Sequence, residues 1–370
     1  MGGARLAVTH GRCSGARGPV EEGGVRRRRD QTRGAFTADS KPRRQLRPRL
    51  RRPDASNAAT GYGCEPGRNS VVEGAQGVQA VAVDSEDRPG QYAPAGTARF
   101  YDAYGEFEWL RLEARAYGRL QAISHGDFLR QHVAPGHRVL DAGCGPGRFT
   151  IELVGLGARP VALDTSPVQL EAAVAWCQTA GVRHRVEDFV EGDIVDLSAF
   201  GDESFDAVVC FGGPLSYVCD KRHQAEEELV RVTRPGGLLL VSVMSRFGAT
   251  CNVVRRAALD VLRDRAAGKV WSVLDRGELS GFPSRVPGEM HPPMHLYSSG
   301  ELAALFDSCN ALALAGSNVA AVEGDPAFEE VAADADAWAA AGEVERRLCQ
   351  QPGLVDTGSH LIAVVQRPFE

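Results

Sequence analysis

Four residues near the middle of the chain combine one carboxylate with three closely spaced glycines. Residues 137–149 read HRVLDAGCGPGRF, so that Asp141 precedes Gly143, Gly145 and Gly147. Glycine has no Cβ, so a turn of this kind lets the backbone approach a ligand closely and aim N–H groups at it. We therefore expect a ligand to lie directly on this turn.

The spacing of these residues distinguishes between classes of ligand. A dinucleotide-binding turn needs G-x-G-x-x-G, but Arg148 stands at the third glycine position and Gly147 comes one residue early. A carboxylate at Asp141 would repel a pyrophosphate at short range, whereas it suits a cationic ligand or one with ammonium and hydroxyl donors. A glycine turn without a ligand is the structural alternative.

A second carboxylate follows the next apolar run. Asp164 comes directly after residues 160–163 and lies 21 residues after Gly143, where doubly wound nucleotide-binding sheets place an acid for ribose hydroxyls. A carboxylate accepts both hydroxyl hydrogens of a cis-diol, and such charge-assisted bonds contribute about 1.5–3 kcal/mol each. The alternative for Asp164 is a helix-capping acid.

Strands and helices must alternate if these side chains are to meet. Apolar runs typical of buried strands are separated by segments with helical spacing, which indicates a parallel sheet covered on both faces. The predicted strands are centred on Val139 and Leu140 and then cover 160–163, 184–190, 204–210, 238–243, 312–315 and 361–365. The predicted helices cover 149–154, 220–233, 298–306 and 328–349, and Ser166 with Gln169 predicts a capping box at the start of another.

The turn at 137–149 resembles motif I of the class I S-adenosylmethionine (AdoMet) methyltransferases, in which an acidic residue precedes G-x-G-x-G. The Arg-Pro-Gly-Gly at 234–237, just before an apolar run, is also similar to that family. The resemblance covers about residues 98–368 and is closest to methyltransferase domains of type 11 or 25. It implies an α/β, doubly wound, Rossmann-like fold with a seven-stranded, mostly parallel sheet, helices on both faces and an antiparallel C-terminal hairpin.

The resemblance also implies AdoMet as the cofactor and assigns roles to residues at the strand ends. Asp141 would bind the methionine ammonium through the network of the loop, and Asp164 would hold the ribose. Asp193 would hold the adenine amino group, with Ile194 covering the ring. The residues expected around the cofactor are Tyr101, Asp141, Gly143, Cys144, Gly145, Asp164, Thr165, Asp193, Ile194, Phe211 and Gly212.

Two flanking segments are expected to cover the site. Residues 96–135 are predicted to form a helical lid that becomes ordered near Phe100, with one amphipathic helix through Phe107, Leu110, Ala114 and Tyr117 and a second over 120–132. Residues 246–297 are predicted to form a substrate cover, including a helix over 251–265. Packing into the core is the alternative for the aromatic side chains of the lid, Tyr101 included.

Three residues are candidates for catalysis. His291 and His295 lie in a proline-rich loop, and histidine is a suitable general base near neutral pH. Tyr217 follows a predicted strand end and would orient the acceptor. Surface positions for the histidines and simple packing for Tyr217 are the alternatives, and no metal site is expected.

Residues 1–95 differ from the rest in composition. They carry 17 Lys and Arg against 10 Asp and Glu, with little apolar periodicity, which predicts a disordered basic extension. A nucleic-acid-binding arm, a transit peptide and a wrongly assigned start codon are alternatives. The methyltransferase domain is expected over 96–370.

The prediction for function is AdoMet-dependent methyl transfer to a small-molecule acceptor by in-line displacement. The alternatives are an RNA or protein methyltransferase that uses the basic arm, and a non-enzymatic nucleotide-binding module. Nucleic acid is not the expected partner, because the residues after 95 carry 25 Lys and Arg against 38 Asp and Glu. No apolar run is long enough to span a membrane and the nine cysteines form no C-x-x-C pair, so a cytoplasmic location is expected.

Overall fold

A computed structural model of the chain describes residues 90–255, 269–282 and 290–369. The chain divides into two units, Met1–Gly63 and Cys64–Glu370, and all described residues belong to the second. Nearly all of the predicted extension 1–95 therefore lies outside the described residues, as do residues 256–265 of the helix predicted over 251–265. Among the described residues, no helix is both long and apolar enough to cross a membrane.

Seven strands form one sheet in the order β3-β2-β1-β4-β5-β9-β8. Strands β1 to β5 pair in parallel, whereas β9 runs antiparallel to both β5 and β8. The predicted fold class is confirmed, including the antiparallel C-terminal hairpin. The strands are β1 (Arg138–Ala142), β2 (Arg159–Asp164), β3 (Asp188–Glu191), β4 (Phe205–Cys210), β5 (Thr233–Met244), β8 (Asn310–Ser317) and β9 (His360–Gln366).

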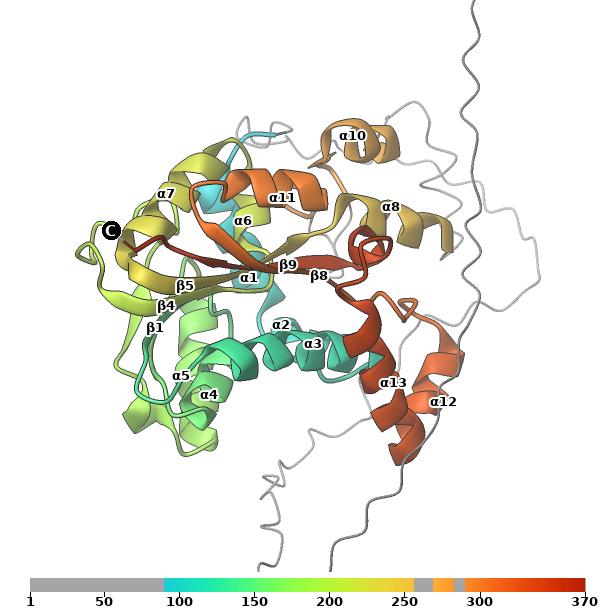
Figure 1. Cartoon of the computed structure of the whole chain (residues 1–370), viewed down its shortest axis with the longest axis horizontal. Helices are drawn as coiled ribbons and strands as arrows, with labels where there is room; N and C mark the ends of the chain where they lie inside the picture. The colour runs from blue at the N-terminus through green and yellow to red at the C-terminus, as the bar shows by residue number, and fades with distance from the viewer. Residues whose placement is uncertain (1–89, 256–268, 283–289, 370) are drawn as a thin grey trace, which may run out of the picture. The chain divides into compact units, whose positions relative to one another are not determined.

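Helices cover both faces of the sheet, as Figure 1 shows. One face packs against α3 (Ala116–His132), α4 (Arg148–Gly155), α5 (Pro167–Thr179) and α13 (Ala335–Leu348). The other face packs against α6 (Pro214–Tyr217), α7 (Arg222–Val232) and α11 (Ser299–Leu305). Within β1, Leu140 packs on the α7 side and Val139 on the α3 side, and both are fully buried. This alternation follows from the period of two residues in a strand.

The segment before β1 is divided differently from the prediction. It forms α1 (Pro94–Tyr104), α2 (Phe107–Arg111) and α3, so the first helix begins before Phe100. A single amphipathic helix through Phe107 and Leu110 was a wrong prediction, because these side chains are 54% and 44% exposed. Gly105 ends α1 with φ +49, a conformation that glycine adopts without strain.

Two strands differ in length from the prediction. Strand β3 begins only at Asp188, because residues Arg183–Arg185 form a turn of 3₁₀ helix instead of the start of a strand. Strand β5 begins at Thr233 and continues through the Pro-Gly-Gly that was expected to break the chain. The register with β4 shifts between Phe205 and Ala207, which accommodates the extra residues at the start of β5.

The described part of residues 246–297 adds two helices and a small sheet. These elements are α8 (Arg246–Arg255), α10 (Lys269–Arg276), β6 (Glu278–Leu279) and β7 (Met294–His295). Val273 of α10 and Met294 of β7 pack against Tyr217 of α6, so the segment covers the helix that follows β4. The remaining helix, α12 (Pro326–Ala333), precedes α13.

Candidate functional site

A pocket opens at the carboxyl ends of β1, β2 and β4, where the strand order reverses direction. Its volume, including open solvent at the mouth, is about 870 Å³. Doubly wound sheets bind their ligands at this position. All predicted cofactor residues except Asp141 line the pocket, and so does Tyr217.

The three glycines of the turn have different roles. All have positive φ values, +78 at Gly143, +52 at Gly145 and +82 at Gly147. A Cβ on Gly143 would lie 2.3 Å from Cγ of Pro214, and a Cβ on Gly147 would lie 3.0 Å from Cβ of Ala173. At Gly145 the nearest atom would be Cγ of Glu108 at 3.7 Å, an ordinary van der Waals contact, so of the three only Gly145 has room for a Cβ.

The N–H groups of the turn are not aimed at a ligand, which corrects the expectation from the sequence. Gly143 and Cys144 both donate to the carbonyl oxygen of Leu163, at 2.7 and 2.9 Å. The N–H of Gly145 donates to Oδ2 of Asp164 at 2.8 Å. A turn whose donors are already used offers little to a phosphate, so the pocket is poorly suited to an anion.

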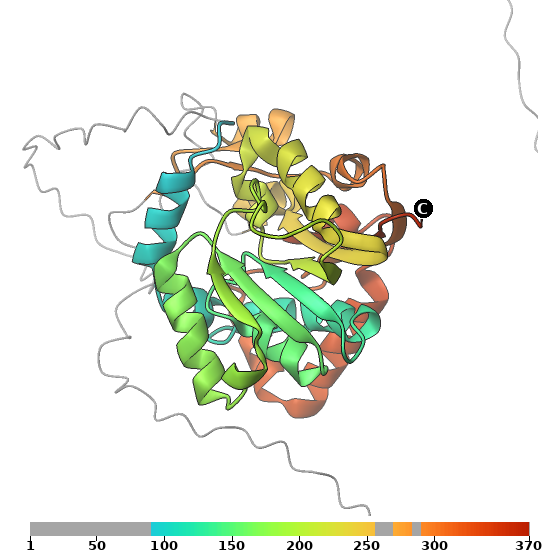
Figure 2. The ribbon, with the colours of Figure 1, turned by 90° about the vertical axis from the view of Figure 1, so that its left-hand side faces the viewer.

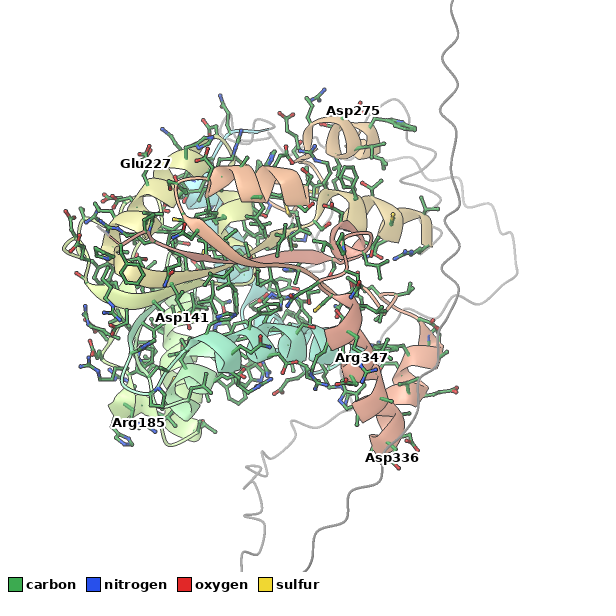
Figure 3. The ribbon with its side chains drawn as sticks, viewed as in Figure 1. Asp141, Arg185, Glu227, Asp275, Asp336 and Arg347 are labelled. Atoms are coloured by element: carbon green, nitrogen blue, oxygen red, sulfur yellow. The ribbon has the colours of Figure 1, made fainter. Side chains whose placement is uncertain are left out.

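Asp141 lies beneath the turn and does not line the pocket. Figure 3 shows it within the body of the protein, and only 1% of its surface is exposed. Its Oδ2 accepts a hydrogen bond of 2.5 Å from the hydroxyl of Thr150 on α4. Burial raises the pKa of Asp141 to about 7, and the nearby Asp164 carboxylate adds to this shift. Its predicted role in binding an ammonium stays a prediction.

Asp164 is held by the backbone on both oxygens. Oδ2 accepts the bond from Gly145 described above, and Oδ1 accepts the N–H of Ser166 at 2.9 Å. Burial raises the pKa of Asp164 to about 6, although these backbone hydrogen bonds favour the ionised form. The carboxylate is therefore fixed at the edge of the pocket with lone pairs left for further donors.

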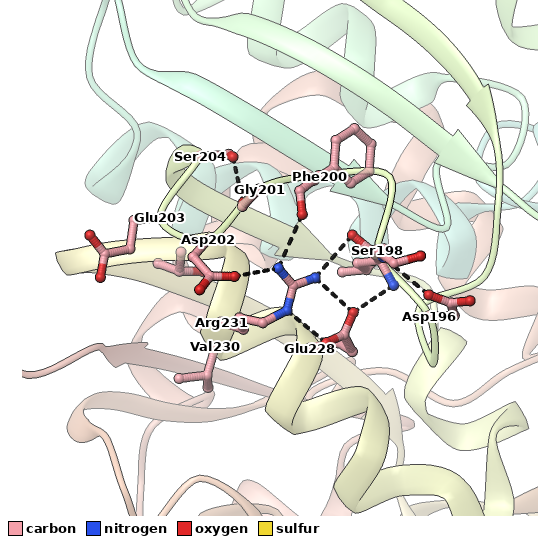
Figure 4. Close-up of polar contacts among 12 residues, drawn as sticks. Asp196, Ser198, Phe200, Gly201, Asp202, Glu203, Ser204, Glu228, Val230 and Arg231 are labelled. Carbon is pink, nitrogen blue, oxygen red and sulfur yellow. Dashed lines mark hydrogen bonds and ion pairs between the residues drawn. The ribbon is translucent and has the colours of Figure 1, made fainter.

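Asp193 and Ile194 begin a loop that is fastened to α7. Figure 4 shows the guanidinium of Arg231 inside this loop, where it donates to the carbonyl oxygens of Leu197 and Phe200, both at 3.0 Å. The same group forms ion pairs of 2.7 Å with Asp202 and with Glu228. The backbone that follows Asp193 therefore has a fixed path.

Aromatic side chains form a further wall of the pocket. Tyr101 of α1 meets Tyr217 edge to face, with ring centroids 5.5 Å apart. Phe211 packs edge to face against Phe149 of α4 at 5.4 Å. Burial raises the pKa of Tyr217 to about 12, so its phenol is neutral at physiological pH.

The two candidate histidines are not part of this wall. His291 packs against Phe100 of α1, with ring centroids 4.9 Å apart. His295 is 8% exposed and packs edge to face on Tyr297, and burial lowers its pKa to about 4. The geometry gives no support to a catalytic role for either residue, and that role stays a prediction.

An ion pair that the sequence reading missed also lines the pocket. The guanidinium of Arg111 donates two hydrogen bonds to the Glu108 carboxylate, from Nε to Oε2 at 3.0 Å and from Nη2 to Oε1 at 2.5 Å, and both residues line the pocket. An acid and a base three residues apart are typical of an exposed helix face, so nothing in the local pattern indicated a buried position. The other pocket residues missed include Tyr92, Thr97, Arg148 and Phe149.

Helix α5 holds the lid in place. Ser166 caps α5 by accepting the N–H of Gln169, but Gln169 does not return the bond as the predicted capping box requires. Its side-chain amide instead donates to the carbonyl oxygens of Tyr101 and Gly105, at 2.9 and 3.1 Å. Figure 2 shows α1 beside α5, in agreement with these bonds. At Ser298 the predicted capping box is confirmed.

Comparisons with known proteins agree with this geometry. Residues 139–237 match a family model described as a methyltransferase domain. Over this segment the chain is similar to the class I AdoMet-dependent methyltransferases. The matched residues run from β1 to the Gly-Gly in β5 and thus include the turn, Asp164 and Asp193.

Named relatives cover only part of the chain. Glycine N-methyltransferase of Mus musculus is 29% identical over 182 residues, which are 46% of this chain and 59% of that protein. A malonyl-[acyl-carrier protein] O-methyltransferase of Erwinia pyrifoliae is 32% identical over 173 residues, 42% of this chain and 62% of that protein. A solved SAM-dependent methyltransferase from Methanosarcina mazei has a TM-score of 0.45 and 17% identity, covering 66% of this chain and 98% of that one. The chain therefore spans about three fifths of the length of the first two relatives.

Proposed function

We propose that this chain binds AdoMet in the pocket above the glycine turn and transfers its methyl group to a small-molecule acceptor. The observation that carries the proposal is the pocket itself. Acidic side chains from successive strand ends meet there beside Gly145, which has room for a Cβ.

The carboxylates in the pocket wall are complementary to the cationic and hydroxyl groups of AdoMet. Asp164, Asp193 and Glu108 make the pocket acidic, which favours a ligand with an ammonium, a sulfonium and hydroxyl donors. The N–H groups of the turn are satisfied internally, so a phosphate-bearing ligand would gain little.

Each residue then has a proposed role. Asp164 accepts ribose hydroxyl hydrogens with the lone pairs left free by the backbone bonds, and Asp193 accepts from the adenine amino group. Asp141 lies under the turn, where its negative charge would stabilise an ammonium through the loop. Arg111 would pair with the methionine carboxylate, because it brings a half-buried positive charge to the pocket wall.

The chemistry needs positioning more than acid–base catalysis. When bound, AdoMet supplies a methyl group that its positively charged sulfur already activates. The aromatic rings of Tyr101, Tyr217 and Phe211 exclude water, and a ring face that is turned to the ligand is electron-rich and attracts a cation. We propose that the neutral phenol of Tyr217 orients the acceptor, since precise placement alone can contribute an effective molarity of about 10⁵ M or more.

The acceptor is proposed to be small because the printed names of the relatives point to small methylated groups. Glycine and a malonyl group on a carrier protein are the acceptors in the two names given above. A cytoplasmic location is part of the same proposal.

Substitution of Arg111 tests whether this residue binds the carboxylate of the cofactor or only maintains the structure of the pocket. We expect Arg111→Gln to weaken binding of S-adenosylhomocysteine about tenfold, because a charge-assisted pair with the ligand carboxylate is lost. Binding of 5′-methylthioadenosine, which lacks the amino-acid group, should change less than about twofold by the same argument. Isothermal titration of both compounds measures this.

The outcome that contradicts the assignment of Arg111 is an equal loss for both compounds, or no loss for either. Arg111→Lys is the matched control, because it keeps the positive charge and loses the planar fork. We expect an intermediate affinity for S-adenosylhomocysteine in this variant. Circular dichroism and thermal unfolding verify that both variants are folded, since Glu108 loses its partner in the first.

A further inference from the structure

A residue just before the lid reaches across to the adenine end of the proposed cofactor site. Tyr92 precedes α1, and its hydroxyl donates a hydrogen bond to Oδ2 of Asp193, 101 residues further along the chain. Both side chains line the pocket, together with Ile194. The contact was not expected from the sequence, in which Tyr92 fell within the extension predicted to be disordered.

The position of Tyr92 is fixed by more than this bond. Its backbone N–H donates to Oδ1 of Asp220 at 2.8 Å, and its ring packs against the core cluster on the α7 side of the sheet. The phenol is thus held at the pocket by its own backbone and ring.

The bond determines what the Asp193 carboxylate can accept. Its Oδ1 already accepts the N–H of Val195 at 3.0 Å, and Oδ2 accepts the Tyr92 hydroxyl. A carboxylate has about four lone-pair sites, so one remains on each oxygen. These two donors, one on each oxygen, fix the plane of the group. Asp193 is therefore held as a pure hydrogen-bond acceptor in one orientation.

We propose that Tyr92 is a positioning residue that sets the preference of this site for a 6-amino purine over a 6-oxo purine. This inference depends on the proposed function, in which Asp193 accepts from the adenine amino group. A 6-oxo purine presents an acceptor at the same place, which a fixed carboxylate repels. Without the Tyr92 hydroxyl the carboxylate loses one of the two bonds that hold its orientation, so it can rotate and the repulsion falls.

Tyr92 supports ligand binding and does not compete with it. The amino group of the purine uses a lone pair that Tyr92 leaves free, so both donors are accommodated by one carboxylate. The ring of Tyr92 keeps its packing when the hydroxyl is removed, so phenylalanine fits the same space. Removing the hydroxyl is therefore expected to weaken binding, not to strengthen it.

The test is a comparison of two ligands that differ only at the purine 6-position. In the full chain, isothermal titration measures binding of S-adenosylhomocysteine and S-inosylhomocysteine to the unchanged protein and to Tyr92→Phe. We expect Tyr92→Phe to lose about tenfold in affinity for the adenosine compound and less than about twofold for the inosine compound, so that selectivity falls. Tyr297→Phe is the control, since its hydroxyl donates to the carbonyl of Leu215 away from the pocket. This control should leave selectivity unchanged.

A second variant keeps the proposal testable if Tyr92→Phe is unstable. Asp193→Asn offers an amide donor, so we expect it to favour the inosine compound. Adding Tyr92→Phe to Asp193→Asn should then change selectivity little, because the two residues act through one contact. Unchanged selectivity in Tyr92→Phe, additive effects in the double variant, or tighter binding of S-adenosylhomocysteine would overturn the role of Tyr92. No binding of S-adenosylhomocysteine by the folded, unchanged protein would overturn the proposed function as well.

Discussion

Two buried carboxylates beside the glycine turn link the stability of the domain to the charge of its ligand. Burial raises the pKa of Asp141 to about 7 and that of Asp164 to about 6, from an ordinary value of 3.8. The folded state therefore binds more protons than the unfolded chain between these values. The stability that the two groups contribute is fully present below about pH 4 and is lost as the pH rises through about 6 to 7. A cationic ligand offsets this loss, because it favours the ionised carboxylates.

The affinity for the cofactor should follow the ionisation of Asp164. We expect binding of S-adenosylhomocysteine to be about tenfold weaker at pH 5 than at pH 7.5, because the ribose needs an ionised acceptor. Asp164→Asn should bind weakly and lose most of this pH dependence, whereas Glu343→Gln, on the exposed surface of α13, should behave like the unchanged protein. Isothermal titration across this pH range tests the prediction. A flat profile in the unchanged protein would contradict it.

The part of the pocket at Asp193, where we propose that the adenine binds, depends on how the loop after β3 is attached to α7. The loop between β3 and β4 carries Asp193 and Ile194 and has little regular structure of its own. Arg231 of α7 supplies the attachment through two carbonyl oxygens and two carboxylates (Figure 4). The planar guanidinium can satisfy these partners together, which an ammonium cannot do.

Loss of this attachment should loosen the loop more than it destabilises the fold. We expect Arg231→Ala to lower the free energy of unfolding by about 1–2 kcal/mol, since the ion pairs are near the surface and screened. Amide hydrogen exchange in residues 194–204 should rise clearly, and Arg231→Lys should show a smaller increase. Hydrogen-exchange mass spectrometry of the three proteins measures this. Unchanged exchange in Arg231→Ala would show that the loop keeps its path without the guanidinium.

Elements with a strong internal pattern were predictable from the sequence, and those shaped by distant contacts were not. The strands β1, β2 and β4 were placed to within a residue or two because each is a buried apolar run between turn residues. Strand β5 was predicted too short, because its pairing with β4 and β9 overrides the local effect of Pro-Gly-Gly. The segment before β1 was predicted as one helix through Phe107 and Tyr117 and a second over 120–132, but α2 ends at Arg111 and the next helix begins only at Ala116.

The residues of the candidate site likewise include some that were predictable from the sequence and some that were not. Gly145, Asp164 and Asp193 follow predicted strands, and the carboxyl ends of parallel strands meet at one edge, so their meeting was predictable. Tyr92 and Arg111 reach the pocket only because residues 90–112 fold back over it. Nothing in the sequence spacing between these residues and the strand ends indicates that they fold back over the pocket. Their contribution became visible only with the contacts to Asp193 and Glu108.

For the domain as a whole, a sheet supplies the floor of the site and the segment before it supplies the cover. The glycine turn, the two buried acids and the Asp193 loop belong to the sheet, while Tyr92, Tyr101 and Arg111 belong to residues 90–111. Residues 90–111 are attached by hydrogen bonds to Gln169 of α5, which packs on the sheet, and to Asp193 in the loop after β3. Ligand binding should therefore stabilise both parts together.

The most direct test of the account is binding of AdoMet and S-adenosylhomocysteine to the full chain by isothermal titration, with Gly145→Ala and Gly155→Ala beside it. Gly145 lines the pocket, where an added Cβ would lie 3.7 Å from Cγ of Glu108, whereas Gly155 ends α4 away from the pocket with no atom within 4 Å of an added Cβ. We predict one saturable site for both compounds in the unchanged protein and in Gly155→Ala. In a folded Gly145→Ala protein the affinity should fall at least about tenfold, although the left-handed alanine costs only about 1–2 kcal/mol of stability. A folded chain that binds neither compound, or a Gly145→Ala variant that binds as tightly as the unchanged protein, would contradict the account.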